Sequence, residues 1–184
     1  MMIKCGMWNI NGVTSKLGSS SSSKLDFADV EKMLCKYHIF GLVETHTAHN
    51  SNHDIKGYKT YKQDRKRGKR AKRYSGGIAV YVWDKIQHGI TCVKQSPEII
   101  WLRLKREYFE ISEDIYLSFT YANPESSSYQ PQENHMEMML NDLSNFNRVG
   151  KCIIMGDLNG RVGDLPDYPE FDVQTDTFAT APLP

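Results

Sequence analysis

The sequence predicts an α+β fold with sizeable antiparallel or mixed sheets. Many short apolar runs are rich in β-branched and aromatic residues, and such runs are typical of strands. Only two segments have the helical period, and the predicted strands often follow one another directly. A parallel doubly wound fold would separate most strands by helices, so this order disfavours it. With 184 residues, 40% of them hydrophobic, the chain can form the core of one domain.

The N-terminal part is expected to hold a strand, a loop and a helix. Residues 2–8 are rich in apolar side chains and indicate a first strand, after which Asn-Ile-Asn-Gly at 9–12 forms a turn. Glycine and serines at 18–23 indicate a flexible loop. Apolar residues then recur at helical spacing over 25–37.

Strands are expected to dominate the middle of the chain. The apolar run at 38–43 predicts a second buried strand that ends at Glu44. Strands at 58–62 and 77–83 flank the densest run of positive charge, at 63–73, and predict a hairpin with a basic tip. Further strands are predicted at 89–93, 99–105 and 115–121.

The C-terminal part begins with the second predicted helix, at 132–146, where the apolar residues have the helical period. A strand at 151–155 then leads into Gly-Asp-Leu-Asn-Gly at 156–160. From residue 161 onward the sequence is Pro-rich and irregular, without a recognisable closing strand or helix. We therefore expect a single domain, 1–184, that lacks its C-terminal part.

The charges are unevenly distributed along the chain. Residues 1–110 contain 20 Lys and Arg against 10 Asp and Glu, whereas residues 111–184 contain 3 against 12. This division suggests that one part meets a polyanion while another gathers carboxylates around a metal. Chance segregation on a solvated surface is the alternative.

Targeting and cysteine patterns point to an intracellular protein. The sequence shows neither an apolar stretch long enough to span a bilayer nor a secretory signal pattern. Four cysteines are far apart and form no CxxC pair, namely Cys5, Cys35, Cys92 and Cys152. We expect them to be reduced and buried rather than ligands of zinc or members of disulfides.

Polar clusters follow three of the predicted strands. They are Asn-Ile-Asn-Gly at 9–12, Glu-Thr-His at 44–46 and Gly-Asp-Leu-Asn-Gly at 156–160. Strand ends that converge on one rim can assemble a metal and phosphate site, and their oxygen donors suit Mg²⁺. Alone, each cluster could equally be an ordinary turn or a solvated strand end.

Taken together and in order, five segments resemble successive motifs of the endonuclease/exonuclease/phosphatase superfamily. They are WNINGV at 8–13, GLVETHT at 41–47, SGGIAVYV at 75–82, TYANPESS at 120–127 and IIMGDLNGRVGD at 153–164. The resemblance implies a DNase I-like, four-layer α/β/β/α sandwich of two mostly antiparallel or mixed sheets, here incomplete at the C-terminus. Glu-Thr-His and Gly-Asp-Leu-Asn-Gly-Arg-Val-Gly look most like the LINE-type (non-LTR) retrotransposon branch.

The resemblance also implies roles for individual residues. Glu44 would be the principal ligand of Mg²⁺, or of Mn²⁺ in its place, and Asn11 stands where many members have a second, metal-associated Asp. Asp157 would activate the attacking water and Asn159 would hold Asp157 and contact phosphate. Asn9 and Tyr121 would hold the site and approach the scissile phosphate. A phosphate contact by Asn123 is doubtful, because the family order of Pro and Asn is reversed here.

One part of the family site is missing from the sequence. The family completes it with a late Ser-Asp-His or similar motif, and no histidine follows Gly-Asp-Leu-Asn-Gly. We therefore expect the chain to be weakly active or inactive on its own. His46, beside Glu44, is expected to be a surface or supporting residue, and His135 is expected to be solvated.

The resemblance implies an endonuclease that nicks DNA as part of a larger retrotransposon polyprotein with a reverse transcriptase. We expect a monomer, nuclear when it acts on DNA, with no membrane contact. The basic run would follow the DNA backbone through Lys66, Arg67, Lys69 and Arg70, unless it is only a solvated loop or a nuclear-localisation patch. The alternatives are an inositol-phosphate or phospholipid phosphodiesterase or phosphatase of the same superfamily, or a catalytically dead DNA- or protein-binding remnant.

Overall fold

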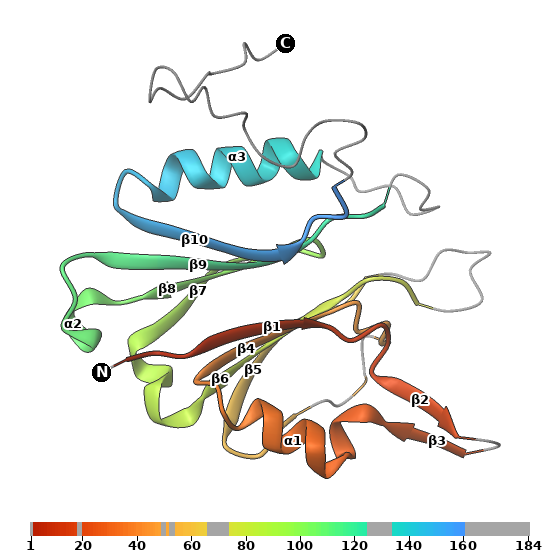
Figure 1. Cartoon of the computed structure of the whole chain (residues 1–184). Helices are drawn as coiled ribbons and strands as arrows, with labels where there is room; N and C mark the ends of the chain where they lie inside the picture. The colour runs from red at the N-terminus through yellow and green to blue at the C-terminus, as the bar shows by residue number, and fades with distance from the viewer. Residues whose placement is uncertain are drawn as a thin grey trace, which may run out of the picture.

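The protein is a sandwich of two four-stranded sheets with a helix outside each sheet (Figure 1). The computed structural model describes residues 2–17, 20–48, 51, 54–65, 74–124 and 134–160. The four layers and the two mixed sheets confirm the predicted fold class. Across the described ranges, no helix has the length and apolar character to cross a membrane.

The first sheet has the strand order β1-β4-β6-β5. Its strands are β1 (Cys5–Asn9), β4 (Ile39–Val43), β5 (Tyr58–Gln63) and β6 (Ile78–Trp83). Strand β1 runs parallel to β4, whereas β6 is antiparallel to both β4 and β5. Every residue of β4 is buried, which explains its uninterrupted apolar sequence.

The second sheet repeats this plan in the order β10-β9-β8-β7. Its strands are β7 (Ile90–Gln95), β8 (Ile99–Leu104), β9 (Asp114–Tyr121) and β10 (Gly150–Asp157). Strand β10 is parallel to β9, and the remaining pairs are antiparallel. Each sheet therefore carries one parallel pair at one edge.

Helices cover the outer faces of both sheets (Figure 1). Helix α1 (Ala28–Leu34) lies over the first sheet and α3 (His135–Phe146) over the second. Short helical turns join other elements: η1 (Lys24–Asp26), η2 (Asp84–Gly89) and α2 (Arg106–Phe109). A separate two-stranded sheet pairs β2 (Thr14–Leu17) with β3 (Ser20–Ser23).

The main core lies between the two sheets. Fourteen buried residues form it, including Val43, Val80, Leu102 and Phe119. The sheets approach closely at Gly41, where an added Cβ would lie 2.1 Å from Cδ1 of Phe119. Smaller apolar clusters fill the space beneath α1 and α3. Each helix buries one face, which accounts for its helical period of apolar residues. The central strands are buried on both faces, which accounts for their continuous apolar runs.

Several local predictions are wrong. The expected flexible loop at 18–23 contains strand β3, because main-chain pairing with β2 does not depend on the side chains. The expected helix at 25–37 is shorter, since Leu25 belongs to a separate turn capped by the Ser23 hydroxyl. The short helices α2 and η2 were not anticipated.

The predicted burial of the cysteines is also wrong. All four are free, but Cys35 at the end of α1 is exposed and the other three are only partly buried. Three of them, Cys5, Cys92 and Cys152, lie on outer strands of the sheets, where an edge leaves side chains partly open to solvent.

Candidate active site at the sandwich rim

The C-terminal ends of four strands meet at one rim of the sandwich. Strands β1 and β4 end there at Asn9 and Val43, and β9 and β10 end there at Tyr121 and Asp157. This follows from the parallel pairing within each sheet, because parallel neighbours end on the same side. Polar residues at or just after these strand ends are thereby brought together from distant parts of the sequence.

Two side-chain hydrogen bonds join the sheets at this rim. Nδ2 of Asn9 donates to Oδ2 of Asp157 at 2.8 Å, which links β1 to β10. The hydroxyl of Tyr121 donates to Oε1 of Glu44 at 2.5 Å, which links β9 to the residue after β4. Each carboxylate is therefore held by a donor from the opposite sheet.

The Asp157 carboxylate is held in one orientation by donors to both of its oxygens. Besides the bond from Asn9, Oδ1 accepts from the backbone N–H of Asn159 at 3.1 Å. Nδ2 of Asn159 donates to the Ala122 carbonyl at 2.7 Å, and Ala122 N–H donates to the Asp157 carbonyl at 2.9 Å. A carboxylate has further lone pairs, so Asp157 retains capacity to accept a proton or a water hydrogen bond.

Left-handed backbone conformations are concentrated around the rim. Among the described residues, five other than glycine have positive φ, and four of them belong to the rim loops: Asn11 (46°), Glu44 (55°), His46 (54°) and Asn159 (46°). A side chain in this region costs on the order of 1 kcal/mol, and such residues persist where the surrounding structure holds them. The strain places the Glu44 and Asn159 side chains at the rim.

The loop after β1 is bonded directly to the loop after β4. Gly12 N–H donates to the Glu44 carbonyl at 2.6 Å, and Val13 N–H donates to the Thr45 carbonyl at 2.9 Å. Nζ of Lys24 donates to the Ile10 carbonyl at 2.7 Å and supports the same turn from behind. Asn11, which is exposed, is consequently next to Glu44.

A match to a family model identifies the family of the chain. The model of the endonuclease/exonuclease/phosphatase family matches residues 8–177, a segment that contains every strand of both large sheets except the first residues of β1. The chain belongs to the endonuclease/exonuclease/phosphatase family. No curated protein matches the sequence at a significant level.

Two solved structures of this family show the same fold at low sequence identity. The 3′ phosphatase NExo from Neisseria, bound to a product DNA hairpin, is similar with a TM-score of 0.54 and 12% identity, covering 89% of this chain and 60% of that one. The human Nocturnin catalytic domain is similar with a TM-score of 0.50 and 14% identity, covering 86% and 64%. The endonuclease domain of TRAS1, a telomere-specific non-LTR retrotransposon, matches with a TM-score of 0.46 and 17% identity, covering 76% and 55%. The chain therefore spans less than two thirds of each.

The donor set at the rim fits the divalent metal typical of the family. Glu44 offers a carboxylate that is largely buried, with Oε1 bonded to Tyr121 and Oε2 3.9 Å from Nε2 of His46. Asn11 lies in the adjoining turn, and its amide oxygen would be the second protein ligand. In the part of the chain that the structure describes, no group of three or more His, Cys, Asp and Glu could hold a metal. One carboxylate with waters and substrate phosphate is a common arrangement for Mg²⁺, so the residues present fit that ion.

Tyr121 remains protonated beside Glu44. Its burial, and then the hydrogen bond and negative charge of Glu44, raise the pKa of the phenol well above its ordinary value. The raised pKa is consistent with the direction of the hydrogen bond, since a protonated phenol donates to the carboxylate. Tyr121 therefore orients Glu44 at neutral pH.

Most of the residues singled out from the sequence lie at the rim. Asn9, Asn11, Glu44, Tyr121, Asp157 and Asn159 come from its four strand ends and the loops that follow them. The side chain of Asn123 contacts Arg65, from which its Oδ1 accepts a hydrogen bond. Lys66, Arg67, Lys69 and Arg70 lie outside the described residues, although the strands that flank them do pair as predicted.

Other predictions for polar residues need correction or addition. His135 is buried rather than solvated, with Nε2 3.0 Å from the Thr120 hydroxyl, because the first turn of α3 packs on the second sheet. Arg65 and Lys24 were missed. Lys24 lies in a stretch that looks like ordinary surface, and Arg65 lies within the basic run at 63–73, where nothing in the sequence distinguishes it from its charged neighbours.

Proposed function

We propose that the chain is a metal-dependent endonuclease that hydrolyses phosphodiester bonds and nicks DNA. The observation that supports this most is the pair of links across the rim, which places an oriented Asp157 on one sheet beside a metal-ligand carboxylate, Glu44, on the other. A metal ligand and a water-activating carboxylate on facing sheets can act on opposite sides of one phosphate.

In this proposal Asp157 accepts the proton of the attacking water. The water oxygen bonds to phosphorus, the bond from phosphorus to the 3′ oxygen breaks, and the departing 3′ oxygen takes up a proton from solvent, so the products are a 5′ phosphate and a 3′ hydroxyl. Asn9 and Asn159 keep Asp157 aligned for this transfer through their hydrogen bonds to its two oxygens. A Mg²⁺ ion held by Glu44 and Asn11 would supply positive charge beside the phosphate oxygens.

We further propose that the biological substrate is chromosomal DNA and that the chain is the endonuclease of a non-LTR retrotransposon. The support is in the motifs, namely Glu-Thr-His at 44–46 and Gly-Asp-Leu-Asn-Gly-Arg-Val-Gly at 156–163. The basic run at 63–73 would contribute affinity for the DNA backbone. Action in the nucleus, together with a reverse transcriptase in the same polyprotein, belongs to this proposal.

The direct test is nicking of supercoiled plasmid DNA by the purified chain with Mg²⁺ or Mn²⁺. We expect weak nicking that is abolished by EDTA and reduced at least about a hundredfold further in Glu44→Gln and in Asp157→Asn, since each removes a charged group from the reaction. Glu113→Gln is the matched control, because Glu113 is paired with Lys151 away from the rim.

The same preparations distinguish the competing functions. Release of phosphate from inositol phosphates without nicking of DNA would show that the chain is a phosphatase and not an endonuclease. Salt-dependent binding of DNA with neither metal binding nor hydrolysis would identify a binding remnant.

A further inference from the structure

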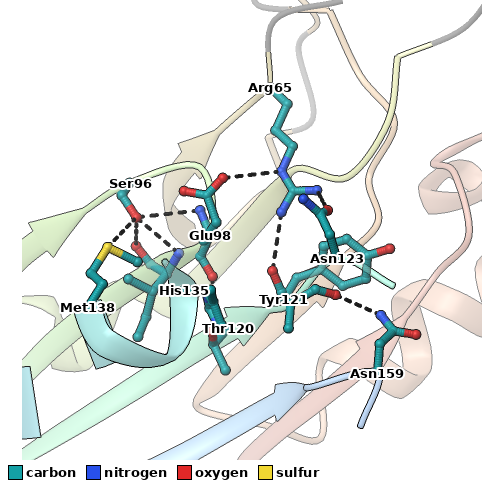
Figure 2. A network of polar contacts seen from close by, with 11 residues as sticks. Arg65, Ser96, Glu98, Thr120, Tyr121, Asn123, His135, Met138 and Asn159 are labelled. Carbon is teal, nitrogen blue, oxygen red and sulfur yellow. Dashed lines mark hydrogen bonds and ion pairs between the residues drawn. The ribbon is translucent and has the colours of Figure 1, made fainter. Parts of the chain in front are cut away.

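A buried arginine joins the two sheets beside the active-site rim. Arg65 follows β5 of the first sheet, and only 1% of its side chain is exposed. Figure 2 shows its guanidinium directed towards the end of the second sheet. Nη1 donates to Oδ1 of Asn123, Nη2 donates to the Tyr121 carbonyl at 3.2 Å, and Nε lies 3.7 Å from Oε1 of Glu98.

Arg65 contacts Tyr121 at two places. Besides the bond to its carbonyl, the guanidinium carbon lies 4.9 Å from the centre of the phenol ring. The main chain and the ring face of Tyr121 are therefore both held by one planar group, while its hydroxyl reaches Glu44 at the other end. A guanidinium can stack on an aromatic ring and donate in its own plane at the same time.

The segment just before β6 leaves space for the Arg65 guanidinium. At Gly76, which has φ +65°, an added Cβ would lie 2.3 Å from Nη1 and 2.6 Å from Cζ of Arg65. Gly76 belongs to the Ser-Gly-Gly segment that precedes β6, so one glycine of that motif is explained by Arg65.

Asp64, the residue before Arg65, supports the loop that carries Glu44. Oδ1 of Asp64 accepts a hydrogen bond from the Thr47 hydroxyl at 2.5 Å, and Thr47 lies in the loop that carries Glu44. Two consecutive residues after β5 thus hold the Glu44 loop and the Tyr121 strand end, respectively.

We propose that Arg65 is a positioning residue of this site, whose guanidinium holds the Tyr121 phenol in the orientation that engages Glu44. The inference rests on the proposed function in so far as Glu44 is the metal ligand. Arg65 is too deeply buried to touch DNA. A lysine in its place would keep the charge opposite Glu98 but has no planar fork to donate twice and stack.

The test follows Tyr121 directly by NMR of the full chain labelled with [ζ-¹³C]tyrosine. Its resonance is assigned by comparison with Tyr121→Phe. We expect Arg65→Lys to shift or broaden this resonance while the fold is retained. Arg103→Lys is the matched control, because it removes the forked contact of Arg103 with Asp114 at the far end of the second sheet, opposite Tyr116, and should leave Tyr121 unchanged. An unchanged Tyr121 resonance in folded Arg65→Lys would overturn the proposal.

A second variant covers the case in which Arg65→Lys does not fold. Asn123→Ala removes one acceptor of the guanidinium and keeps the Arg65–Glu98 pair, and the same shift of Tyr121 is expected. If Tyr121 is unaffected in that variant, the orientation of its phenol does not depend on the alignment of the guanidinium and the proposal is wrong.

Addition of Mn²⁺ tests the proposed function separately. The paramagnetic ion should broaden the Tyr121 resonance in the native chain and not in Glu44→Gln. A shift in Arg65→Lys without broadening by Mn²⁺ would support the positioning role and reject the metal site. In the nicking assay, Arg65→Lys should lower kcat by about a hundredfold with KM for DNA unchanged, since the residue aligns reacting groups without binding substrate.

Discussion

The two acidic residues of the rim depend on partners that are far away in the sequence. Asp157 is held by Asn9, 148 positions earlier, and Glu44 by Tyr121, 77 positions later. Each partner is a neutral donor, so each orients a carboxylate without neutralising its charge. At the scale of single residues, the site is therefore an arrangement of oriented acceptors.

The Asn9–Asp157 hydrogen bond can be tested by Asn9→Ala. This change removes the donor to Oδ2 of Asp157, and we expect kcat for nicking to fall by about ten- to a hundredfold because Asp157 loses one of its two orienting bonds. The free energy of unfolding should fall by only about 1 kcal/mol in urea denaturation. Asn141→Ala, on the exposed side of α3, is the control. Unchanged kcat would show that Asp157 needs no support from β1.

Cys5 provides a pH-dependent prediction. Burial raises the pKa of its thiol to about 11, so little thiolate is present near pH 8 and alkylation should be slow. Cys35 is exposed and should react first with iodoacetamide, as measured by mass spectrometry of the native chain. The stability gained by keeping Cys5 neutral is present below the ordinary thiol pKa and is lost as the pH rises towards about 11. Equal alkylation rates at the two cysteines would contradict this account.

At the scale of elements, β4 and β9 determine how closely the two sheets pack. Both are central strands, and their contact at Gly41 and Phe119 leaves no room for a side chain at position 41. The same strands lead to Glu44 and Tyr121, so the packing of these elements also sets the spacing at the rim. A change in the distance between the sheets would therefore also change the distances between the site residues.

Gly41→Ala tests this coupling. The new Cβ would overlap the Phe119 ring, and overpacking of this kind costs roughly 1–3 kcal/mol in the free energy of unfolding. Urea denaturation should show this loss, and Phe119→Leu in the same chain should recover part of it. Gly160→Ala, where an added Cβ meets nothing within 4 Å, should leave stability nearly unchanged. A loss of equal size at both glycines would argue against close packing of the sheets at β4 and β9.

At the scale of the whole molecule, the parallel pairs give the sandwich two different ends. The rim carries the acidic and amide residues of the site, and the end of β5 and the start of β6 lie on the same side, since Gln63 and Ile78 pair at the rim end of β6. The basic run at 63–73 begins there. A polyanion bound at the rim would therefore meet positive charge beside the site.

The salt dependence of DNA binding tests this arrangement. Replacement of Lys66, Arg67, Lys69 and Arg70 by glutamine should reduce the slope of log Kd against log salt by about 0.9 for each DNA phosphate that these side chains neutralise. The matched control replaces four cations at the opposite end, Lys85, Lys105, Arg106 and Lys151, and should leave the slope unchanged. Fluorescence anisotropy with labelled duplex DNA at several salt concentrations measures the slope for each set of variants. Equal effects of the two sets would indicate binding by net charge alone.

The sequence by itself determined the strands of the two large sheets, the two helices that cover them and nearly all of the candidate site residues. Strand and helix periods arise from burial of one or both faces, which is local information, and the rim residues stand in motifs of fixed order. It also predicted the hairpin formed by β5 and β6, because its strands are neighbours in the chain. The serine strand β3 escaped prediction because its pairing depends on the main chain rather than on side-chain pattern.

Only the tertiary structure decided which residues are partners. Nothing in the sequence pairs Asn9 with Asp157, or places Arg65 beneath Tyr121, because those contacts follow from strand order and from the packing of one sheet on the other. Such contacts join segments that are distant in the chain, and they carry no local period. For the same reason His135 was expected to be in solvent, although the turn of α3 that carries it is covered by the sheet.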